Sequence, residues 1–358
     1  MAGAVVIGGG PSGCAAALTF RAAGVDTTLV TLDRPRLKPT ETAAPPLWRL
    51  LRSLGAESAL DACEPCYGVE SDWGATDAKI QSAMLAPLGH AWFIHRHRFD
   101  AILLQHAEAA GTVILHDEVT EAGFSDKDVI VDTLSRSLVT NRLVIATGSP
   151  KWAADITGQR PSRSDVLVCH WAHLDAPIAS RLLHVETTTE GWWYLCPAET
   201  GDAVACFVTD ARGSRRHGAS RPDGWQASFR NTRLCRDHAL DVAPSRVRSL
   251  TASVSQLRSR LGTLWAAAGD AAVRLDPVGS VGATAALESG MLAARALLSD
   301  ETDPARNRYT CWSEGLWNAF QKRAALIYQV EAKKHPCGFW TRRVATRTDG
   351  LPDSLVET

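Results

Sequence analysis

Residues 4 to 33 constrain the fold more than any other part of this 358-residue chain. Residues 4–7 are all apolar, as in a buried parallel strand. A glycine-rich turn that fits GxGxxG follows, and the Ala/Leu-rich residues 14–23 predict a helix. Residues 25–32 predict a second strand with Asp33 at its end. The order strand, turn, helix, strand predicts a Rossmann-type dinucleotide-binding unit.

Each glycine of the turn has its own role in binding a dinucleotide. Gly8 permits the tight turn, Gly10 lets the backbone approach a pyrophosphate, and Gly13 lets helix and strand pack closely. The helix N-terminus offers N–H groups and a partial positive charge to the phosphates. The carboxylate of Asp33 is placed to bind ribose hydroxyls. The expected binding residues are therefore Gly8, Gly10, Pro11, Ser12, Gly13 and Asp33.

A second motif indicates which dinucleotide is bound. No other GxGxxG occurs in the sequence, which favours one permanently bound dinucleotide, FAD, over a separate NAD(P)H domain. Residues 264–268 predict a strand that leads to Gly269-Asp270, and a Pro/Gly turn precedes a helix predicted over 283–298. Asp270 is placed to hold the ribityl chain, and the turn can present N–H groups to a reduced flavin ring. The expected flavin-binding residues here are Gly269, Asp270, Pro277, Gly279 and Gly282.

These motifs resemble the flavin-binding segments of the p-hydroxybenzoate hydroxylase-like monooxygenases and the flavin-dependent halogenases. The resemblance is carried by GDAA at 269–272, DPVGSVG at 276–282 and VIATG at 144–148, whose strand returns to the nucleotide at Gly148. It implies that an arginine before a helix contacts the flavin. Arg96 is the preferred match and Arg98 the second.

Three further segments are similar to the LodB-like flavoproteins, a group that includes maturation factors of quinone-containing amino-acid oxidases. They are LKPTETAAPP at 37–46, the segment 185–197 that ends in GWWYLCP, and the segment 328–343 with YQVE and FWTRR. Thr40 stands where the K-x-G-E-x-x-P-P pattern of the group has glycine. The resemblance implies oxygenation of the indole ring of a tryptophan that belongs to a partner protein or peptide.

The expected fold is α/β and p-hydroxybenzoate hydroxylase-like. A Rossmann-type FAD-binding domain is interleaved with a smaller antiparallel β-sheet substrate domain, and C-terminal helices follow. The expected FAD-binding domain comprises residues 1–33, 97–164 and 256–300, and the substrate domain comprises residues 34–96 and 165–255. Residues 301–358 are expected to form a helical segment with a basic tail. The polar stretch 212–221 predicts a loop.

The expected reaction uses molecular oxygen as co-substrate and proceeds through a flavin C4a-hydroperoxide. The protein must exclude water and hold an electron-rich ring near the reactive oxygen, and Trp192 is the preferred apolar wall. A base helps to remove the ring proton, and Glu41 and Glu331 lie in the motif-matching segments. Lys38 can stabilise a developing anion. We therefore predict catalytic roles for Lys38, Glu41, Trp192 and Glu331, with His95 and His170 as further candidate bases.

Other activities stay open on this scaffold. One is a small-molecule hydroxylase, dehydrogenase or halogenase of a natural-product pathway; another is a flavoprotein chaperone without catalysis. Halogenation is disfavoured because Tyr194 and Cys196 replace Trp and Ile of the W-x-W-x-I-P pattern of tryptophan halogenases. NAD(P)H, or reduced flavin from a separate flavin reductase, is the expected electron source.

Composition and charge exclude several other classes of protein. The chain is 45% hydrophobic and has a net charge of −1, so it lacks the basic excess that nucleic acid or anionic lipid would attract. No run reaches the roughly 18 apolar residues of a membrane span, so no membrane insertion is expected. The N-terminal apolar stretch has no preceding basic residue and does not resemble a secretory signal, so we expect a cytoplasmic protein.

The nine cysteines are expected to be reduced thiols. Cys63 and Cys66 have CxxC spacing, but no second pair completes a zinc site, so no metal is expected. The tail carries basic residues with no acid among them, which could form a docking patch for an acidic partner or a solvated tail. They are Lys333, Lys334, Arg342, Arg343 and Arg347.

Overall fold

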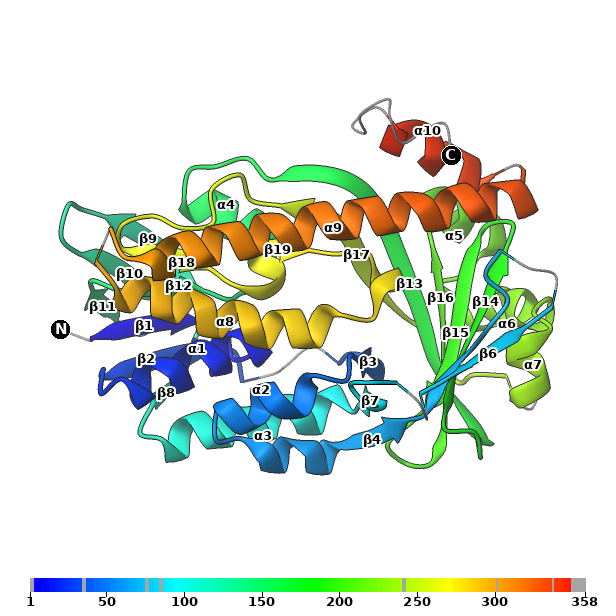
Figure 1. The fold of residues 1–358 in the computed structure, drawn as a ribbon, viewed down its shortest axis with the longest axis horizontal. Helices are drawn as coiled ribbons and strands as arrows, with labels where there is room; N and C mark the ends of the chain where they lie inside the picture. The colour runs from blue at the N-terminus through cyan, green and yellow to red at the C-terminus, as the bar shows by residue number, and fades with distance from the viewer. Residues whose placement is uncertain are drawn as a thin grey trace. The chain divides into compact units, whose positions relative to one another are not determined.

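The computed structural model describes residues 3–33, 37–74, 77–83, 86–239, 243–300, 302–336 and 338–348 (Figure 1). The chain divides into two compact units. The first comprises residues 1–64, 96–163 and 255–317, and the second comprises residues 65–95, 164–254 and 318–358. Each unit is thus assembled from three separate stretches of sequence. The functional division into a cofactor domain and a substrate domain, with the boundaries given above, stays a prediction.

The first unit is built on a five-stranded parallel sheet. Its order is β18 (Trp265–Ala267), β12 (Leu143–Ile145), β1 (Ala4–Ile7), β2 (Thr27–Thr31) and β8 (Val113–His116). Every neighbouring pair runs parallel. All four residues of β1 are buried, which explains why its sequence is apolar throughout rather than alternating. This sheet confirms the predicted Rossmann-type half.

Helices pack closely around this sheet. α1 (Pro11–Ala22) and α8 (Gly282–Leu298) approach so tightly that a Cβ on Gly290 would lie 2.0 Å from the Ser12 carbonyl oxygen. The other elements of the unit are α2 (Leu47–Ser53), η1 (Glu57–Ala62), α3 (Arg96–Ala109), α4 (Pro150–Ile156), β3 (Glu41–Ala43), β19 (Val273–Arg274), η2 (Gly269–Ala271) and η3 (Pro277–Gly279). A small antiparallel sheet is formed by β9 (Val119–Phe124), β10 (Val129–Thr133) and β11 (Ser137–Thr140).

The second unit contains a larger sheet that is mostly antiparallel, as predicted. Its strands follow the order β17 (Arg248–Gln256), β13 (Ser162–Pro177), β16 (Asp202–Thr209), β15 (Gly191–Pro197), β14 (Leu182–Thr188), β5 (Gly68–Ser71) and β6 (Lys79–Ser82). β14 and β5 form a parallel pair within it. Of two further short strands, β4 (Cys63–Cys66) precedes β5 in the sequence and β7 (Ala91–Ile94) follows β6.

Alternation along β15 separates two neighbouring tryptophans. Trp193 points into the core, where its ring centroid lies 4.7 Å from Phe207 and 5.0 Å from Trp225. Trp192 and Tyr194 lie on the opposite face of the strand, with ring centroids 6.0 Å apart. Trp193 therefore packs in the core on one face of the strand, whereas Trp192, which is also buried, lies on the other face.

Helices complete the second unit: α5 (Ala211–His217), α6 (Pro222–Arg230), α7 (Leu234–His238) and α10 (Phe339–Thr348). The loop predicted over residues 212–221 is wrong, because most of it is α5. The Asp210 carboxylate caps this helix by accepting hydrogen bonds from the amides of Arg212 and Gly213, each 2.9 Å long. A polar, arginine-rich segment is compatible with an exposed helix once such a cap is present.

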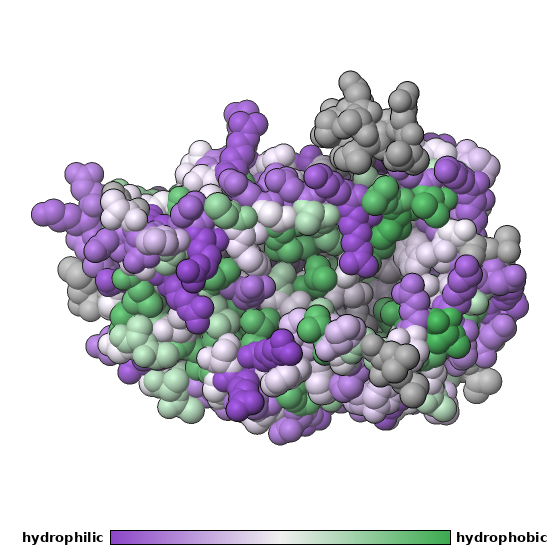
Figure 2. Space-filling view, viewed as in Figure 1, coloured by the Kyte–Doolittle hydropathy of each residue, from purple (hydrophilic) through white to green (hydrophobic). Residues whose placement is uncertain are grey.

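The 31-residue helix α9 (Pro304–Lys334) begins in the first unit and ends in the second. Its C-terminal half carries the exposed apolar side chains Leu326 and Val330, and Figure 2 shows hydrophobic side chains gathered over that part of the helix. Among the described residues, no helix combines the length and the apolar character that a membrane crossing requires.

Candidate functional site

The turn between β1 and α1 combines two crowded glycines with an open one. Gly8 has a φ of 114°, and a Cβ on it would lie 2.3 Å from the Ala146 carbonyl oxygen. A Cβ on Gly13 would lie 1.8 Å from the Gly8 carbonyl oxygen. A Cβ on Gly10 would meet no atom within 4 Å. The first two glycines are required for packing, while Gly10 borders open space of the kind that a pyrophosphate needs.

The N-terminus of α1 is suited to an anion. The helix begins at Pro11, and its N-cap residue Gly10 has no side chain that could accept hydrogen bonds from the first turn. The first turn contains no acidic residue. The buried Ser12 and the Gly13 amide therefore lie at a helix end with a partial positive charge and no capping carboxylate.

The carboxyl ends of the neighbouring parallel strands supply further predicted residues. Asp33 follows β2 and is 79% exposed, with its carboxylate 3.0 Å from Nδ1 of His116 at the end of β8. Gly148 follows β12 with a φ of 67°, which favours glycine. Ligands bind at this edge in open parallel sheets, so both positions fit the nucleotide site.

The second flavin motif forms a turn at the start of α8. Asp270 lies on η2, with its carboxylate 3.6 Å from the Arg274 guanidinium. Gly269 donates its amide hydrogen to Ser289, over 3.0 Å. The turn from Pro277 to Gly282 contains Ser280, the single non-glycine residue with positive φ among the described residues (φ 51°). Such backbone conformations concentrate at ligand-binding turns.

These features fit a flavin dinucleotide. A Cβ on Gly282, at the start of α8, would meet no atom within 4 Å, so this helix end is also open to a ligand. The glycine-rich turn, Asp33, Gly148 and the second motif all belong to the first unit. A single unit thus carries every predicted FAD-binding residue.

Arg96 lies buried at the start of α3 between two carboxylates. Its Nη1 donates to both oxygens of Glu41, at 2.8 and 2.9 Å, and its Nε and Nη2 donate to Asp100, at 3.0 and 2.8 Å. Arg98 is exposed by comparison. The bidentate pairs fix the orientation of the Arg96 guanidinium and therefore that of the chain entering α3.

The same contacts determine the chemistry of Glu41. Burial acts to raise the pKa of this carboxyl, but Arg96 and Lys38 outweigh it and leave the pKa below its ordinary value. Both carboxylate oxygens are occupied by the Arg96 guanidinium. Lys38 itself is exposed. Glu41 is thus a firmly ionised partner of an arginine, which is a poor state for accepting a proton.

Trp192, in the second unit, belongs to a cluster of aromatic rings. Trp73 lies 6.1 Å from Trp192 and 6.0 Å from Trp340, measured between ring centroids. Trp192 is 3% exposed, and its Nε1 has no hydrogen-bond partner among the described residues. We call Trp73, Trp192, Tyr194 and Trp340 the tryptophan cluster. That Trp192 forms an apolar wall for a substrate stays a prediction.

Glu331 is joined to this cluster through the backbone. The Gly74 amide, next to Trp73, donates a short hydrogen bond to Oε1 of Glu331. The Glu331 side chain is completely buried, and its Oε2 has no hydrogen-bond partner in the described part of the chain. Burial raises the pKa of Glu331, although the Gly74 amide, the Thr187 hydroxyl and the Lys334 ammonium oppose it. A buried carboxyl with a raised pKa is a candidate for a general base.

An ion pair that the sequence analysis missed holds the Trp73 segment in place. Lys334, one turn beyond Glu331 on α9, donates to Asp72 Oδ2 and to Thr187 Oγ1, each over 2.8 Å. The other Asp72 oxygen accepts from the Thr187 amide over 2.8 Å. The ion pair was not predicted because Asp72 belongs to no sequence motif and Lys334 was grouped with the basic tail by its charge. The YQVE segment that ends at Glu331 is the only signal near them.

The remaining tail residues are also engaged. Arg342 and Arg343 both pair with Asp210, at 2.8 and 3.1 Å, and Arg343 also pairs with Asp165 at 2.6 Å. Lys333 is exposed, and the side chain of Arg347 lies outside the described part of the structure. Three of the five basic side chains thus serve internal ion pairs rather than a free docking patch.

Two other candidates from the sequence, His170 and the Cys63/Cys66 pair, have the surroundings of structural residues. His170 is buried, and its ring nitrogens contact the hydroxyls of Ser249 and Ser214, at 2.8 and 2.9 Å. Burial lowers the pKa of His170 to about 4. Cys63 and Cys66 are free thiols, and burial raises the pKa of Cys63 to about 12 and also raises that of Cys66. Neither cysteine has the lowered pKa of a reactive thiol.

Comparisons with known proteins define the class. Residues 3–174 match the family described as pyridine nucleotide-disulphide oxidoreductase. The FAD-dependent oxidoreductase LodB of Marinomonas mediterranea is 26% identical over 96% of this chain and 96% of its own length.

Solved structures of flavoenzymes have the same fold. The peptidyl tryptophan dihydroxylase QhpG is 23% identical, with a TM-score of 0.78 over 98% of this chain and 79% of its own. The myxobacterial chondrochloren halogenase CndH is 18% identical, with a TM-score of 0.83 over 96% of this chain and 85% of its own.

The comparisons indicate an FAD-dependent oxidoreductase, and its fold is shared with solved hydroxylase and halogenase structures. The sequence is similar to that of LodB along nearly its whole length, as its motifs predicted.

Proposed function

We propose that this protein is an FAD-dependent monooxygenase that oxygenates the indole ring of a tryptophan in a partner protein or peptide. The observation that carries the proposal is Glu331. Oε1 of this buried carboxyl is bonded to the amide next to Trp73, in the tryptophan cluster, and Oε2 has no hydrogen-bond partner among the described residues. A base in such surroundings suits the removal of a proton from an aromatic ring in a site that excludes water.

Similar proteins support the choice of substrate. QhpG is a peptidyl tryptophan dihydroxylase that is essential for tryptophylquinone cofactor biogenesis. Its fold covers 98% of this chain, and LodB aligns with 96% of it, so the likeness includes both units. We extend the peptidyl tryptophan substrate to this chain as part of the proposal.

The first unit would hold FAD through the glycine-rich turn, Asp33 and the turn that precedes α8. When bound and reduced, the flavin supplies the activation of molecular oxygen for transfer to an electron-rich ring. NAD(P)H, or reduced flavin from a separate reductase, would supply the electrons. The ion pair of Arg96 and Glu41 would keep the start of α3 rigid beside the cofactor.

The second unit would hold the substrate indole against Trp192. Glu331 Oε2 would accept the ring proton while Oε1 stays bonded to the Gly74 amide. Glu331 is preferred over Glu41 as the base, since its pKa is raised whereas that of Glu41 is lowered. Lys38 remains a candidate for stabilising negative charge.

The test is mass spectrometry of a tryptophan-bearing partner peptide after co-expression with this protein. The wild type should add oxygen to a tryptophan residue. Glu331→Gln should lower the rate by about 10²- to 10⁴-fold with FAD content unchanged. Glu314→Gln, an exposed carboxyl on the same helix, is the matched control and should keep the wild-type rate. A Glu331→Gln protein with wild-type turnover would refute the assigned base.

The same measurement separates the rival functions. Chlorine or bromine in the product would identify a halogenase. Partner maturation that survives in an Asp270→Ala protein shown to lack FAD would identify a chaperone and refute catalysis. If free aromatic compounds are oxygenated and no peptide is, the small-molecule enzyme replaces the proposal.

A further inference from the structure

Three side chains far apart in the sequence converge in the second unit. Oε2 of Glu70, on β5, lies 2.9 Å from Nδ1 of His184, on β14, and 2.9 Å from Nε2 of His238, at the end of α7. The two imidazole rings are stacked, with centroids 3.9 Å apart and planes 25° apart. The three ligand atoms all lie within 4.8 Å of one another.

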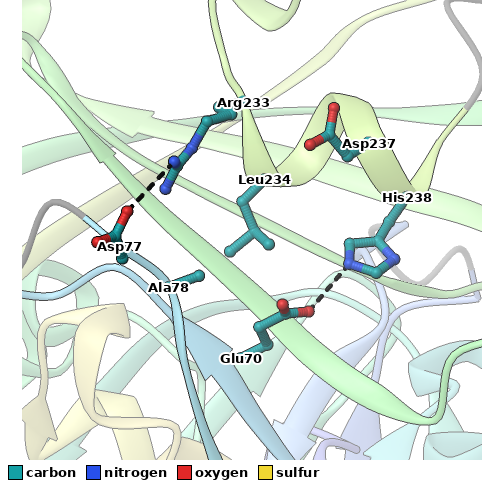
Figure 3. Close-up of a pocket in the computed structure, with 7 residues that line it drawn as sticks. All are labelled: Glu70, Asp77, Ala78, Arg233, Leu234, Asp237 and His238. Carbon is teal, nitrogen blue, oxygen red and sulfur yellow. Dashed lines mark ion pairs between the residues drawn. The ribbon is translucent and has the colours of Figure 1, made fainter.

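Glu70 and His238 line a pocket in the second unit. The cavity has a volume of about 270 Å³ and is lined by Glu70, Asp77, Ala78, Arg233, Leu234, Asp237 and His238. Figure 3 shows His238 and Glu70 pointing toward one another across it. Three carboxylates and one guanidinium give the lining a net negative charge, and that guanidinium lies 3.7 Å from Asp77. The His184 side chain is completely buried behind the pocket.

We propose that Glu70, His184 and His238 bind a divalent transition-metal ion of the zinc type. Two imidazole nitrogens and one carboxylate oxygen form a ligand set that zinc accepts. Metal–ligand bonds of about 2.0–2.1 Å place neighbouring ligand atoms roughly 3 Å apart. The two oxygen–nitrogen separations of 2.9 Å are close to this value, and the two nitrogen atoms lie within 4.8 Å of each other. Three protein ligands leave a coordination position for water from the pocket.

A bound ion would connect three elements of the second unit. The short helix α7 is held at its beginning by Glu186, on β14, which accepts hydrogen bonds from the amides of Arg233 and Cys235, at 2.7 and 3.1 Å. The metal would hold its other end, at His238, to β14 and β5. The ion would thus act as a structural cross-link, independent of the flavin, and should stabilise the folded chain by mass action.

The test is titration of the purified, FAD-loaded full chain with zinc chloride, followed by calorimetry and thermal melting. Cobalt(II) absorption reports whether nitrogen and oxygen or thiolate ligands are bound. The wild type should bind one equivalent at this site and melt at a higher temperature with zinc. His238→Ala and Glu70→Gln should weaken binding at least tenfold. His106→Ala, a partly exposed histidine on α3 that contacts Ser58, should bind like the wild type.

His238 is 34% exposed, so its replacement should leave the chain folded, and retained FAD absorbance verifies this. If His238→Ala is unstable, His238→Gln keeps most of the side-chain volume and provides the same comparison. A wild type that binds no zinc would overturn the proposal and leave a hydrogen-bonded cluster. Binding that is unchanged in folded His238 and Glu70 variants, or cobalt spectra with thiolate character, would also overturn it.

Discussion

Replacing Gly10 and Gly13 one at a time by alanine separates cofactor binding from folding. Gly10 has φ −83° and ψ −178°, a conformation that alanine adopts without strain. Its new Cβ would meet no protein atom within 4 Å. We therefore expect Gly10→Ala to change the stability of the apoprotein by no more than about 0.5 kcal/mol.

The same methyl group would occupy the space assigned to the pyrophosphate. Crowding of this kind costs about 1–3 kcal/mol, which corresponds to roughly 5- to 150-fold weaker FAD binding. Gly13→Ala should behave in the opposite way, because its Cβ would lie 1.8 Å from the Gly8 carbonyl oxygen. That backbone overlap should cost about 3 kcal/mol or more of folding free energy.

The assay removes the flavin, measures the melting temperature of each apoprotein, and then titrates FAD by flavin fluorescence. The expected pattern is a Gly10 variant with normal melting and weak binding, and a Gly13 variant with a melting temperature lowered by about 6 °C or more. If the apo form of Gly10→Ala melts normally and binds FAD as tightly as the wild type, the pyrophosphate does not pass over Gly10. The assignment of the nucleotide site would then be wrong.

Three further predictions concern charged side chains. Burial raises the pKa of Glu331, so ionising this carboxyl in the folded chain costs stability once the pH rises above the ordinary glutamate pKa of 4.5. Glu331→Gln should therefore gain stability relative to the wild type as the pH rises above that value, measured by thermal melts across the pH range. Burial alone would raise the pKa of Asp210, but the neighbouring cations and the α5 amides outweigh it and lower the pKa to about 2. Asp210→Ala should therefore lower the free energy of unfolding by about 1 kcal/mol or more at pH 7. In acid unfolding that difference should shrink as the pH falls below 4 toward 2, and a constant difference would contradict the assignment. Glu41→Gln removes a charge from the buried Arg96 pair and should cost about 1–3 kcal/mol in denaturant titrations, whereas an unchanged midpoint would show that Asp100 alone suffices.

The first unit could be predicted from the sequence because its motifs are local. Residues 4–33 contain the strand, turn, helix and strand in continuous order, and each glycine has a backbone reason visible within a few residues. The parallel sheet and the helix that follows the second motif were predicted for the same reason. The loop predicted from local polarity over residues 212–221 was wrong, because the Asp210 carboxylate caps a helix that covers most of this segment.

The second unit could be predicted only in outline. Glu70 and His184 meet because β5 and β14 pair in parallel, with Glu70 directly opposite His184 in the register. That register depends on strands separated by more than a hundred residues, and no spacing rule in the sequence expresses it. The contact of Lys334, on helix α9, with Asp72 likewise joins residues that are far apart in the sequence. Trp192 and Glu331 were found only through resemblance to a family.

The C-terminal segment supports the candidate site rather than forming a separate tail. Arg343 pairs with Asp165 and Asp210, and its guanidinium lies 3.8 Å above the ring of Phe339. These contacts fix the start of α10, where Trp340 packs against Trp73 and donates a hydrogen bond of 2.6 Å to the Thr188 carbonyl oxygen. Trp73 in turn contacts Trp192. Arg343 thus acts on the tryptophan cluster through the packing of α10, and it helps to position the aromatic rings of the proposed substrate site.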